Sequence, residues 1–254
     1  MKDMIKVTDL QYEKYEEVLL RRDNLRKEAE LYHLQFIKIF GDLITESFRI
    51  KVECIRKKKM ITYCQRLMNL GKDIKSSDLT KYIEKEMAEY QKELQDMIDD
   101  VNAAKNATPI MEVEVRTIKK LYYALVKLIH PDMHPELADD RELKEYWTRI
   151  VTAYRHNDLK EMQELDALVR MHLAGHDIDT EVKIDDIEKK IKEVEKEIES
   201  ILSTDPYLYK LLLADPKEVE EKKQEYKDEI EAYTNYSREL DGVLESFEIK
   251  EMIS

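Results

Sequence analysis

Glycine and proline are scarce in this chain, which contains only four glycines and five prolines among its 254 residues. The tight turns of β-sandwiches and β-barrels depend on these residue types, so the sequence lacks the turn residues that a β-rich fold of this length needs. Hydrophobic residues make up 43% of the chain and charged residues 39%, a mixture typical of long amphipathic helices. We therefore predict an all-α, elongated protein with long coiled-coil helices.

Residues 1–108 carry hydrophobic side chains at alternating spacings of three and four, the pattern of a coiled-coil seam. The first run of this seam, with Arg22 as its one charged member, consists of Tyr15, Val18, Leu25, Ala29, Tyr32, Phe36 and Ile39. Gly41 interrupts the pattern, and a second run ends near Gly71. We predict an N-terminal arm of two or three long helices that fold back on one another. Pro109 marks its boundary, because proline disfavours a helix at the residue before it.

Residues 177–254 carry the most regular heptad pattern in the chain. Its first run consists of Ile184, Ile187, Ile191, Val194, Ile198 and Ile201, and its second of Val219, Tyr226, Ile230, Tyr233, Leu240, Leu244 and Phe247, with Lys223 and Ser237 as polar members. We predict that the two runs form an antiparallel coiled-coil hairpin. A parallel coil between two copies of the chain leaves the same pattern, so a homodimer through the arms stays open.

A leucine-rich segment lies between these two heptad runs. It consists of Tyr207, Leu208, Leu211, Leu212 and Leu213. Such a cluster fits a patch that binds a client or partner, and it fits equally a cap on the core of the hairpin.

Residues 109–176 form a small centre between the two arms. A helix is predicted over about 113–129, followed by the loop HPDMHPELA and then by a helix that Asp139 caps. Asn157 and Asp158 end that helix and cap a further one, which ends at Gly175. The first two helices are amphipathic, and the short loop between them predicts an antiparallel pair whose loop projects beyond a shared core.

The first helix of the centre has a basic face inside an acidic protein. Opposite its hydrophobic residues lie Arg116, Lys120, Tyr123 and Lys127, with Lys119 beside them. A basic face of this kind is often no more than a solvated face, so it indicates a binding surface only together with the loop that follows it. That loop begins with His130, Pro131 and Asp132.

At these residues the chain resembles a J-domain, the module by which cochaperones engage DnaK-type chaperones. Residues 117–127 are similar to the second helix of that family, and His130, Pro131 and Asp132 match its signature tripeptide. The third-helix pattern of the family is matched by Trp147, Ile150, Ala153 and Tyr154. The resemblance covers about residues 114–156 and leaves both arms outside it.

The resemblance implies a role in partner binding, with no chemistry on this chain. The basic face of the helix would dock on the ATPase unit of a DnaK-type chaperone, in which ATP hydrolysis would then accelerate. The residues that would steer this docking are Arg116, Lys119, Lys120 and Lys127, with Tyr123 on the same face. Asp132 would offer its carboxylate to an arginine of the partner. Pro131 would fix the loop backbone, and His130 would position the tip through ring hydrogen bonds.

The chain also departs from the family pattern. No first helix with a Tyr-x-x-Leu-Gly start is recognisable before Val113, and the third helix lacks the usual Asp-Pro ending. A Gly/Phe-rich linker and a cysteine-rich zinc region are both missing from the sequence. These departures support a second hypothesis, a coiled-coil scaffold or assembly protein that has kept a J-like fold and lost chaperone stimulation.

The net charge of −13 argues against general nucleic-acid binding and against docking on an anionic membrane surface. No run approaches the roughly 18 apolar residues of a membrane span. The first ten residues contain no apolar core of signal-peptide length. We therefore expect a cytoplasmic protein with neither a nucleic-acid nor a membrane partner.

No residues of this sequence stand out as a catalytic or metal site. The two cysteines, Cys54 and Cys64, form no C-x-x-C motif. His130, Asp132 and His134 are a weak metal-binding pattern, because a proline lies among them and no further carboxylate is fixed nearby. No Gly-rich phosphate loop is present. We expect a protein that is not an enzyme and needs no cofactor.

Overall fold

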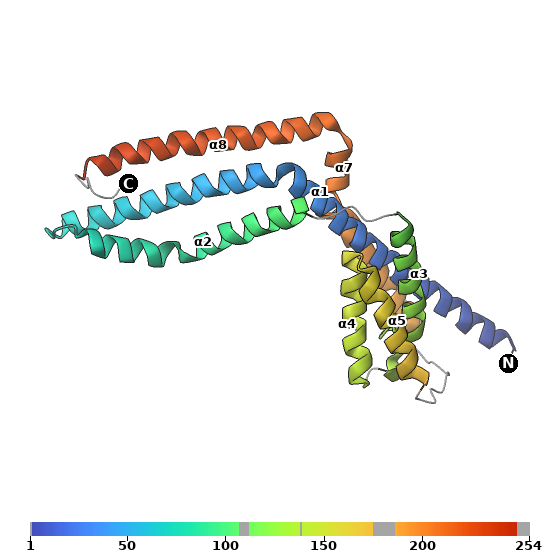
Figure 1. Cartoon of the computed structure of the whole chain (residues 1–254). Coiled ribbons are helices and arrows are strands. Elements are labelled where there is room, and N and C mark those ends of the chain that lie inside the picture. Colours follow the sequence, from blue (N-terminus) through green and yellow to red (C-terminus); the bar gives the residue numbers. More distant parts are fainter. Residues whose placement is uncertain (1, 107–111, 138, 175–185, 248–254) are drawn as a thin grey trace. The chain divides into compact units, whose positions relative to one another are not determined.

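The computed structural model describes residues 2–106, 112–137, 139–174 and 186–247. Over these residues the regular structure is entirely helical and contains no strand, so the all-α prediction is confirmed. The elements are α1 (Lys2–Asn69), α2 (Ser76–Asn106), α3 (Glu112–Ile129), the 3₁₀ turn η1 (Pro135–Leu137), α4 (Arg141–His156), α5 (Leu159–Ala174), α6 (Ile187–Ser203), α7 (Tyr209–Ala214) and α8 (Pro216–Glu245) (Figure 1). Within the described ranges, no helix combines the length and hydrophobicity that a bilayer crossing requires.

The chain divides into two compact units, and each is built from two separate segments. Residues 1–33 group with 108–209, and residues 34–107 group with 210–254. The sequence pattern predicts three consecutive segments instead, over residues 1–108, 109–176 and 177–254. The difference arises because α1 buries its first half in one unit and its second half in the other.

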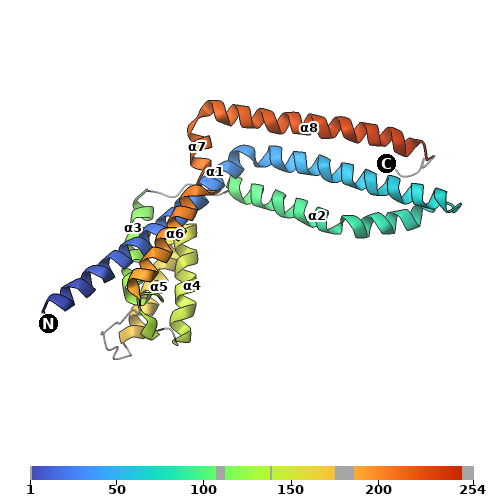
Figure 2. The ribbon, with the colours of Figure 1, turned by 180° about the vertical axis from the view of Figure 1, so that it is seen from behind.

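The first unit contains the start of α1 together with α3, α4, α5 and α6. Helices α3, α4 and α5 pack against one another (Figure 2). Their shared core also takes in hydrophobic residues of α1 and α6, and its fully buried members include Leu19, Ile118, Leu125, Ile150, Met162 and Leu165. The helix pair predicted over the centre of the chain is therefore part of a larger helical unit.

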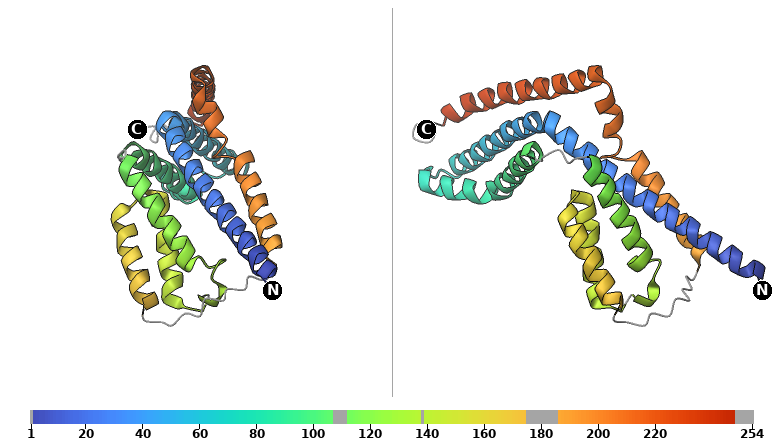
Figure 3. Two further views of the ribbon diagram at one scale, coloured as in Figure 1. Left: turned by 90° about the vertical axis from the view of Figure 1, so that its right-hand side faces the viewer. Right: turned by 45° about the vertical axis from the view of Figure 1, so that its right-hand side comes forward.

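Helix α6 lies beside the first half of α1, and the two run in the same direction (Figure 3). Its heptad residues Ile191, Val194 and Ile198 are buried in the core of the first unit. The predicted hairpin paired this run with the second heptad run, which lies in α8 of the other unit. The structure instead pairs α6 with α1, because the heptad seam of α1 offers a matching apolar stripe. Polar pairs such as Gln11–Glu188 and Arg26–Glu197 border that stripe.

The second unit consists of the second half of α1 with α2, α8 and nearly all of α7. Its core includes Cys64, Leu79, Met87, Leu240 and Leu244. One polar heptad member, Ser237, has a defined partner there, because the Lys57 ammonium donates to its hydroxyl at 2.7 Å and to its carbonyl at 3.2 Å. Asp241 accepts from the same ammonium at 2.6 Å. These contacts fix the register of α8 against α1.

Gly41 lies inside the continuous helix α1 and does not interrupt it, contrary to the prediction. A Cβ atom at this position would lie 2.6 Å from Cγ2 of Val101, which belongs to α2. Glycine is therefore required here by the close approach of two helices and not by a turn. By contrast, a Cβ atom at Gly242 in α8 would meet nothing within 4 Å.

These two glycines make a matched pair for a stability experiment. We expect Gly41→Ala to destabilise the second unit by about 1 kcal/mol, because overpacking of about 1–3 kcal/mol outweighs the gain in helix propensity. Gly242→Ala should stabilise it by about 1 kcal/mol, because only the propensity term acts. Hydrogen exchange of the α2 amides, monitored as a function of urea concentration, measures the change in unfolding free energy of each variant. If Val101→Ala does not relieve the Gly41→Ala defect, the close approach is not its cause.

Candidate partner-binding site

Helix α3 has the two faces that its sequence predicts. Ile118, Tyr122, Leu125 and Ile129 point into the core and are almost completely buried. The residues of the predicted basic face lie on the other side, with Arg116, Lys119, Lys120 and Lys127 exposed and Tyr123 half-buried. Because a helix rises 1.5 Å per residue, this basic face extends roughly 16 Å from Arg116 to Lys127 and ends at the loop.

The loop after α3 is built around His130, which is only 3% exposed. The backbone N–H of His130 closes the last helical turn on the carbonyl of Val126 at 3.1 Å. Its ring Nδ1 accepts from the backbone N–H of Asp132 at 3.0 Å, so the neutral ring carries its proton on Nε2. The ring also packs edge-on against Trp147 of α4, with 4.7 Å between ring centroids. His130 thus supports the loop from beneath.

The pKa of His130 is lowered to about 4, chiefly because burial disfavours the charged ring. The ring is therefore neutral at pH 7 and able to accept from Asp132. Since the folded-state pKa lies below the ordinary value of about 6.5, the unfolded chain binds the proton more readily. The contribution of the neutral His130 ring to the free energy of unfolding is therefore fully present above about pH 6.5. It is lost as the pH falls from about 6.5 toward 4.

Trp147 is the only tryptophan of the chain and reports on this ring. An imidazolium quenches indole emission more strongly than a neutral imidazole. We expect Trp147 fluorescence to titrate with a midpoint near pH 4, and we expect this transition to vanish in His130→Gln and to persist in His172→Gln. Circular dichroism at the same pH values separates the ring titration from unfolding. A midpoint near 6.5 in the wild-type chain would mean that His130 is exposed.

The rest of the loop is held by backbone and ring contacts. The carbonyl of His130 accepts from the N–H groups of Met133 at 2.9 Å and His134 at 2.8 Å. Nε2 of His134 lies 2.7 Å from the carbonyl of Lys127, and its Nδ1 lies 2.9 Å from a carboxylate oxygen of Glu136. Met133 is fully buried in the core. The loop therefore has one defined backbone path, which places Pro131 and Asp132 at its outer edge, both partly exposed.

The carboxylate of Asp132 has no ion pair with a described residue, although cations are near. Burial lowers the pKa of Arg22, but the carboxylates of Asp23, Glu197 and Asp132 outweigh it and raise that pKa. The pKa of the buried Tyr15 hydroxyl is raised by burial first and by the charge of Asp132 second. The Asp132 carboxylate thus lies at the partly exposed edge of the loop, positioned by the hydrogen bond from its own backbone N–H to His130.

Helix α1 forms a third side of this site, and no pattern in the sequence predicts it. The Tyr12 hydroxyl donates to the carbonyl of Met133 at 3.2 Å. Glu16 pairs with Lys127 at 3.0 Å, and the Lys127 side chain remains 62% exposed. Further along α1, the Asn24 side chain donates to the Tyr123 hydroxyl at 2.5 Å. The seam of α1 was visible in the sequence, but its partner lies about a hundred residues away and no local pattern identifies it.

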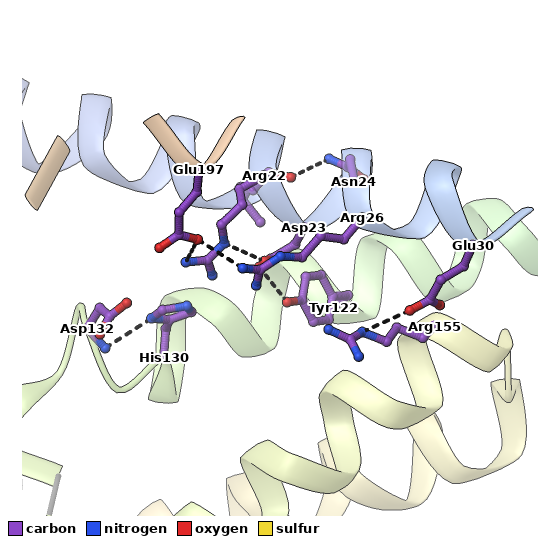
Figure 4. A network of polar contacts seen from close by, with 11 residues as sticks. Arg22, Asp23, Asn24, Arg26, Glu30, Tyr122, His130, Asp132, Arg155 and Glu197 are labelled. Carbon is purple, nitrogen blue, oxygen red and sulfur yellow. Dashed lines mark hydrogen bonds and ion pairs between the residues drawn. The ribbon is translucent and has the colours of Figure 1, made fainter. Parts of the chain in front are cut away.

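Arg22, the one charged member of the first heptad run, belongs to a polar network between α1, α3 and α6 (Figure 4). Its Nε lies 2.9 Å from Asp23, and its Nη1 lies 3.6 Å from Glu197. Asp23 also accepts from the Tyr122 hydroxyl at 2.7 Å. Because charged groups inside a protein need partners, this network explains how Arg22 is tolerated in an apolar seam.

Helix α4 begins one residue later than predicted. Its N-cap is Asp140, whose carboxylate accepts from the N–H groups of Glu142 and Leu143 at 3.0 Å each, so the prediction of Asp139 as the cap is wrong. Asp140 also accepts from His172 of α5 at 2.7 Å. The predicted caps at Asn157 and Asp158 are confirmed, since Asn157 ends α4 in the left-handed region and Asp158 accepts from the N–H of Glu161. Gly175 lies outside the described residues.

The described part of the chain holds no group of three or more His, Cys, Asp or Glu side chains arranged to hold a metal ion. His130, Asp132 and His134 are close in sequence, but the two rings are engaged by backbone groups of the loop and of α3.

The site thus belongs to an all-α unit in which a fixed loop follows a basic helix face and carries a partly exposed carboxylate. Comparisons of the chain with protein-family models, with curated proteins and with solved structures found no match.

Proposed function

We propose that the first unit is a divergent J-domain that binds a DnaK-type chaperone through the His130-Pro131-Asp132 loop and the basic face of α3. One observation carries this proposal. The buried, neutral His130 ring holds the backbone of Asp132, so that its carboxylate lies at the end of a row of exposed cations and has no ion pair with a described residue. An arginine of the partner would donate a charge-assisted hydrogen bond to the Asp132 carboxylate.

The basic face supplies the second part of the proposed contact. Lys119, Lys120 and Lys127 are exposed beside the loop, in a chain whose net charge is −13. An acidic partner surface would be attracted to this face and repelled by most of the remaining surface, which orients the encounter. Glu16 already pairs with Lys127, so the partner would compete with α1 for that one charge.

Helix α1 would serve as the first helix that the family pattern lacks near α3. Tyr15 and Leu19 are buried in the same core as α3 and α4, so this part of α1 belongs to the domain and is not a removable cover. The contact from Tyr12 to Met133 would hold the loop in place for the partner. On this proposal the chain performs no chemistry, and ATP hydrolysis takes place in the chaperone.

Charge reversal of Lys120 tests the proposal at the basic face. We expect Lys120→Glu to weaken binding to an ATP-loaded DnaK-type chaperone from the same cell by about tenfold or more, because it places a like charge against an acidic partner surface. Lys144→Glu, an equal charge change at an exposed position of α4, is the matched control and should bind as the wild type does. Equal affinities for the two variants in a titration at low salt would contradict the docking face.

A second function is a coiled-coil scaffold that has kept the J-like helix pair without its activity. The ion pair between Glu16 and Lys127 favours it, because one of the cations is already neutralised within the chain. On this alternative, Asp132→Asn leaves the cellular phenotype unchanged, whereas charges introduced at Ile191 and Ile198 abolish it. A phenotype that follows Asp132 would reject the scaffold.

A further inference from the structure

The end of the α1–α2 hairpin in the second unit is basic, although the chain as a whole is acidic. Residues 56–75 contain seven basic residues and a single acidic one, whereas the whole chain has a net charge of −13. The basic residues of this segment are Arg56, Lys57, Lys58, Lys59, Arg66, Lys72 and Lys75. The overall charge therefore conceals a strongly basic region.

Only the inner part of this basic region is neutralised within the protein. Lys57 pairs with Asp241, Lys59 with Glu86 and Arg56 with Glu53. Closer to the turn, the guanidinium of Arg66 lies over the ring of Tyr63. Lys72 and Lys75 are exposed and have no ion pair among the described residues. The positive charge at the very end of the hairpin is thus directed to solvent.

The turn itself presents two hydrophobic side chains in a fixed geometry. Helix α1 ends in a Schellman motif, in which the N–H of Lys72 donates to the carbonyl of Leu67 at 3.0 Å and that of Gly71 to Met68 at 2.9 Å. Gly71 adopts the left-handed conformation, with φ of 62°, that this motif requires. The side chains of the last turn are thereby held outward, and Met68 is 58% and Leu70 61% exposed.

We propose that this end of the α1–α2 hairpin docks on an anionic lipid surface, with Met68 and Leu70 entering the headgroup region and Arg66, Lys72 and Lys75 contacting the anionic headgroups. An anionic lipid surface has hydrocarbon beneath a layer of negatively charged headgroups. The apolar side chains of the turn fit the first layer, and the cations beside them in the sequence fit the second. A nucleic acid offers phosphates to the cations but leaves the two apolar side chains without a partner. The lipid surface accounts for both features together.

The overall negative charge of the chain does not prevent this contact. Electrostatic interactions are screened beyond a Debye length of about 8 Å at physiological salt, so a surface that meets the end of the hairpin senses mainly the charges located there. The expectation of no membrane partner rests on the charge of the whole chain, whereas this proposal rests on the charge located at the end of the hairpin. This proposal is independent of the chaperone proposal, which concerns residues of the first unit.

Vesicle flotation with the full chain tests the proposal. We expect binding to vesicles of phosphatidylcholine with about a third phosphatidylserine, little binding to pure phosphatidylcholine, and loss of binding as salt is raised. The double variant Arg66→Glu/Lys72→Glu should bind at least tenfold more weakly. Met68→Ser/Leu70→Ser should also weaken binding, because it removes the inserted apolar groups.

Matched substitutions elsewhere separate the hairpin end from a general surface effect. Lys144→Glu/Lys160→Glu changes the charge equally, and Met171→Ser/Leu211→Ser removes two equally exposed apolar side chains. Both controls should float as the wild type does. The proposal is overturned if the wild-type chain ignores anionic vesicles, or if the hairpin variants bind them as well as the controls do. It is equally overturned if the hairpin end binds duplex DNA or heparin and not vesicles.

Discussion

Replacing Leu19 by alanine is expected to destabilise the first unit by about 2–5 kcal/mol. Leu19 lies in α1, about a hundred residues before α3, yet its side chain is completely buried in the core that α3, α4 and α5 share. The substitution removes the hydrophobic burial of the side chain and leaves a cavity, because neighbouring residues relax only in part. Urea unfolding followed by Trp147 fluorescence reports on this unit specifically, since no other tryptophan is present.

Leu10→Ala in the same helix is the matched control. Leu10 is 68% exposed, so the same change of side chain should alter the unfolding free energy by less than about 0.5 kcal/mol. If Leu19→Ala and Leu10→Ala unfold alike, the first half of α1 does not belong to the core of the first unit. The proposed role of α1 as the missing first helix would then fail as well.

The parts of this fold that the sequence predicted are those that depend on local pattern. The apolar face of α3, the end of α4 at Asn157 and the cap at Asp158 all follow from helical periodicity and from side chains that bond their own backbone. The position of the loop after α3 follows in the same way, because His130 and Pro131 end a helix.

What the sequence could not show depends on contacts between distant segments. A heptad seam does not specify its partner, so α6 was paired with the run in α8 although it packs against α1. Gly41 was interpreted as an interruption because glycine disfavours helices, whereas Val101 of α2 requires it there. The cap of α4 was misplaced by one residue because Asp139 and Asp140 are equally good caps in sequence, and only the structure shows that Asp140 accepts from the first turn.

In the candidate site too, the features set by local pattern were predictable and the contacts between distant segments were not. Its basic face and loop were predicted, and the exposure of Lys119, Lys120 and Lys127 agrees with that prediction. The contacts of Tyr12, Glu16 and Asn24 with α3 and the loop were not predicted, because nothing near these residues marks them as belonging to the centre. A charged residue in an apolar seam, Arg22, was the one local sign that a polar partner would be found.

Asp132→Asn is expected to abolish the stimulation of a partner chaperone while leaving the fold intact. The substitution removes one charge and preserves the side-chain volume, and the backbone N–H that bonds His130 is retained. Hydrogen bonds to charged groups contribute about 1.5–3 kcal/mol, so losing the charge-assisted contact should reduce the interaction by roughly one to two orders of magnitude. The unfolding transition reported by Trp147 should stay where it is in the wild-type chain.

Asp139→Asn provides the control for this change. Asp139 is an exposed carboxylate near the end of the same loop, and the cap of α4 is its neighbour Asp140. The net charge changes equally in the two variants, so any difference between them reports on position. Asp139→Asn should therefore stimulate the chaperone as the wild type does.

The most direct measurement of the central proposal is the single-turnover ATPase rate of a DnaK-type chaperone from the same cell, with the wild-type chain, Asp132→Asn or Asp139→Asn added at equal concentration. The proposal predicts acceleration by the wild type and by Asp139→Asn, and a rate equal to that of the chaperone alone with Asp132→Asn. Equal acceleration by all three chains, or acceleration by none, would contradict it.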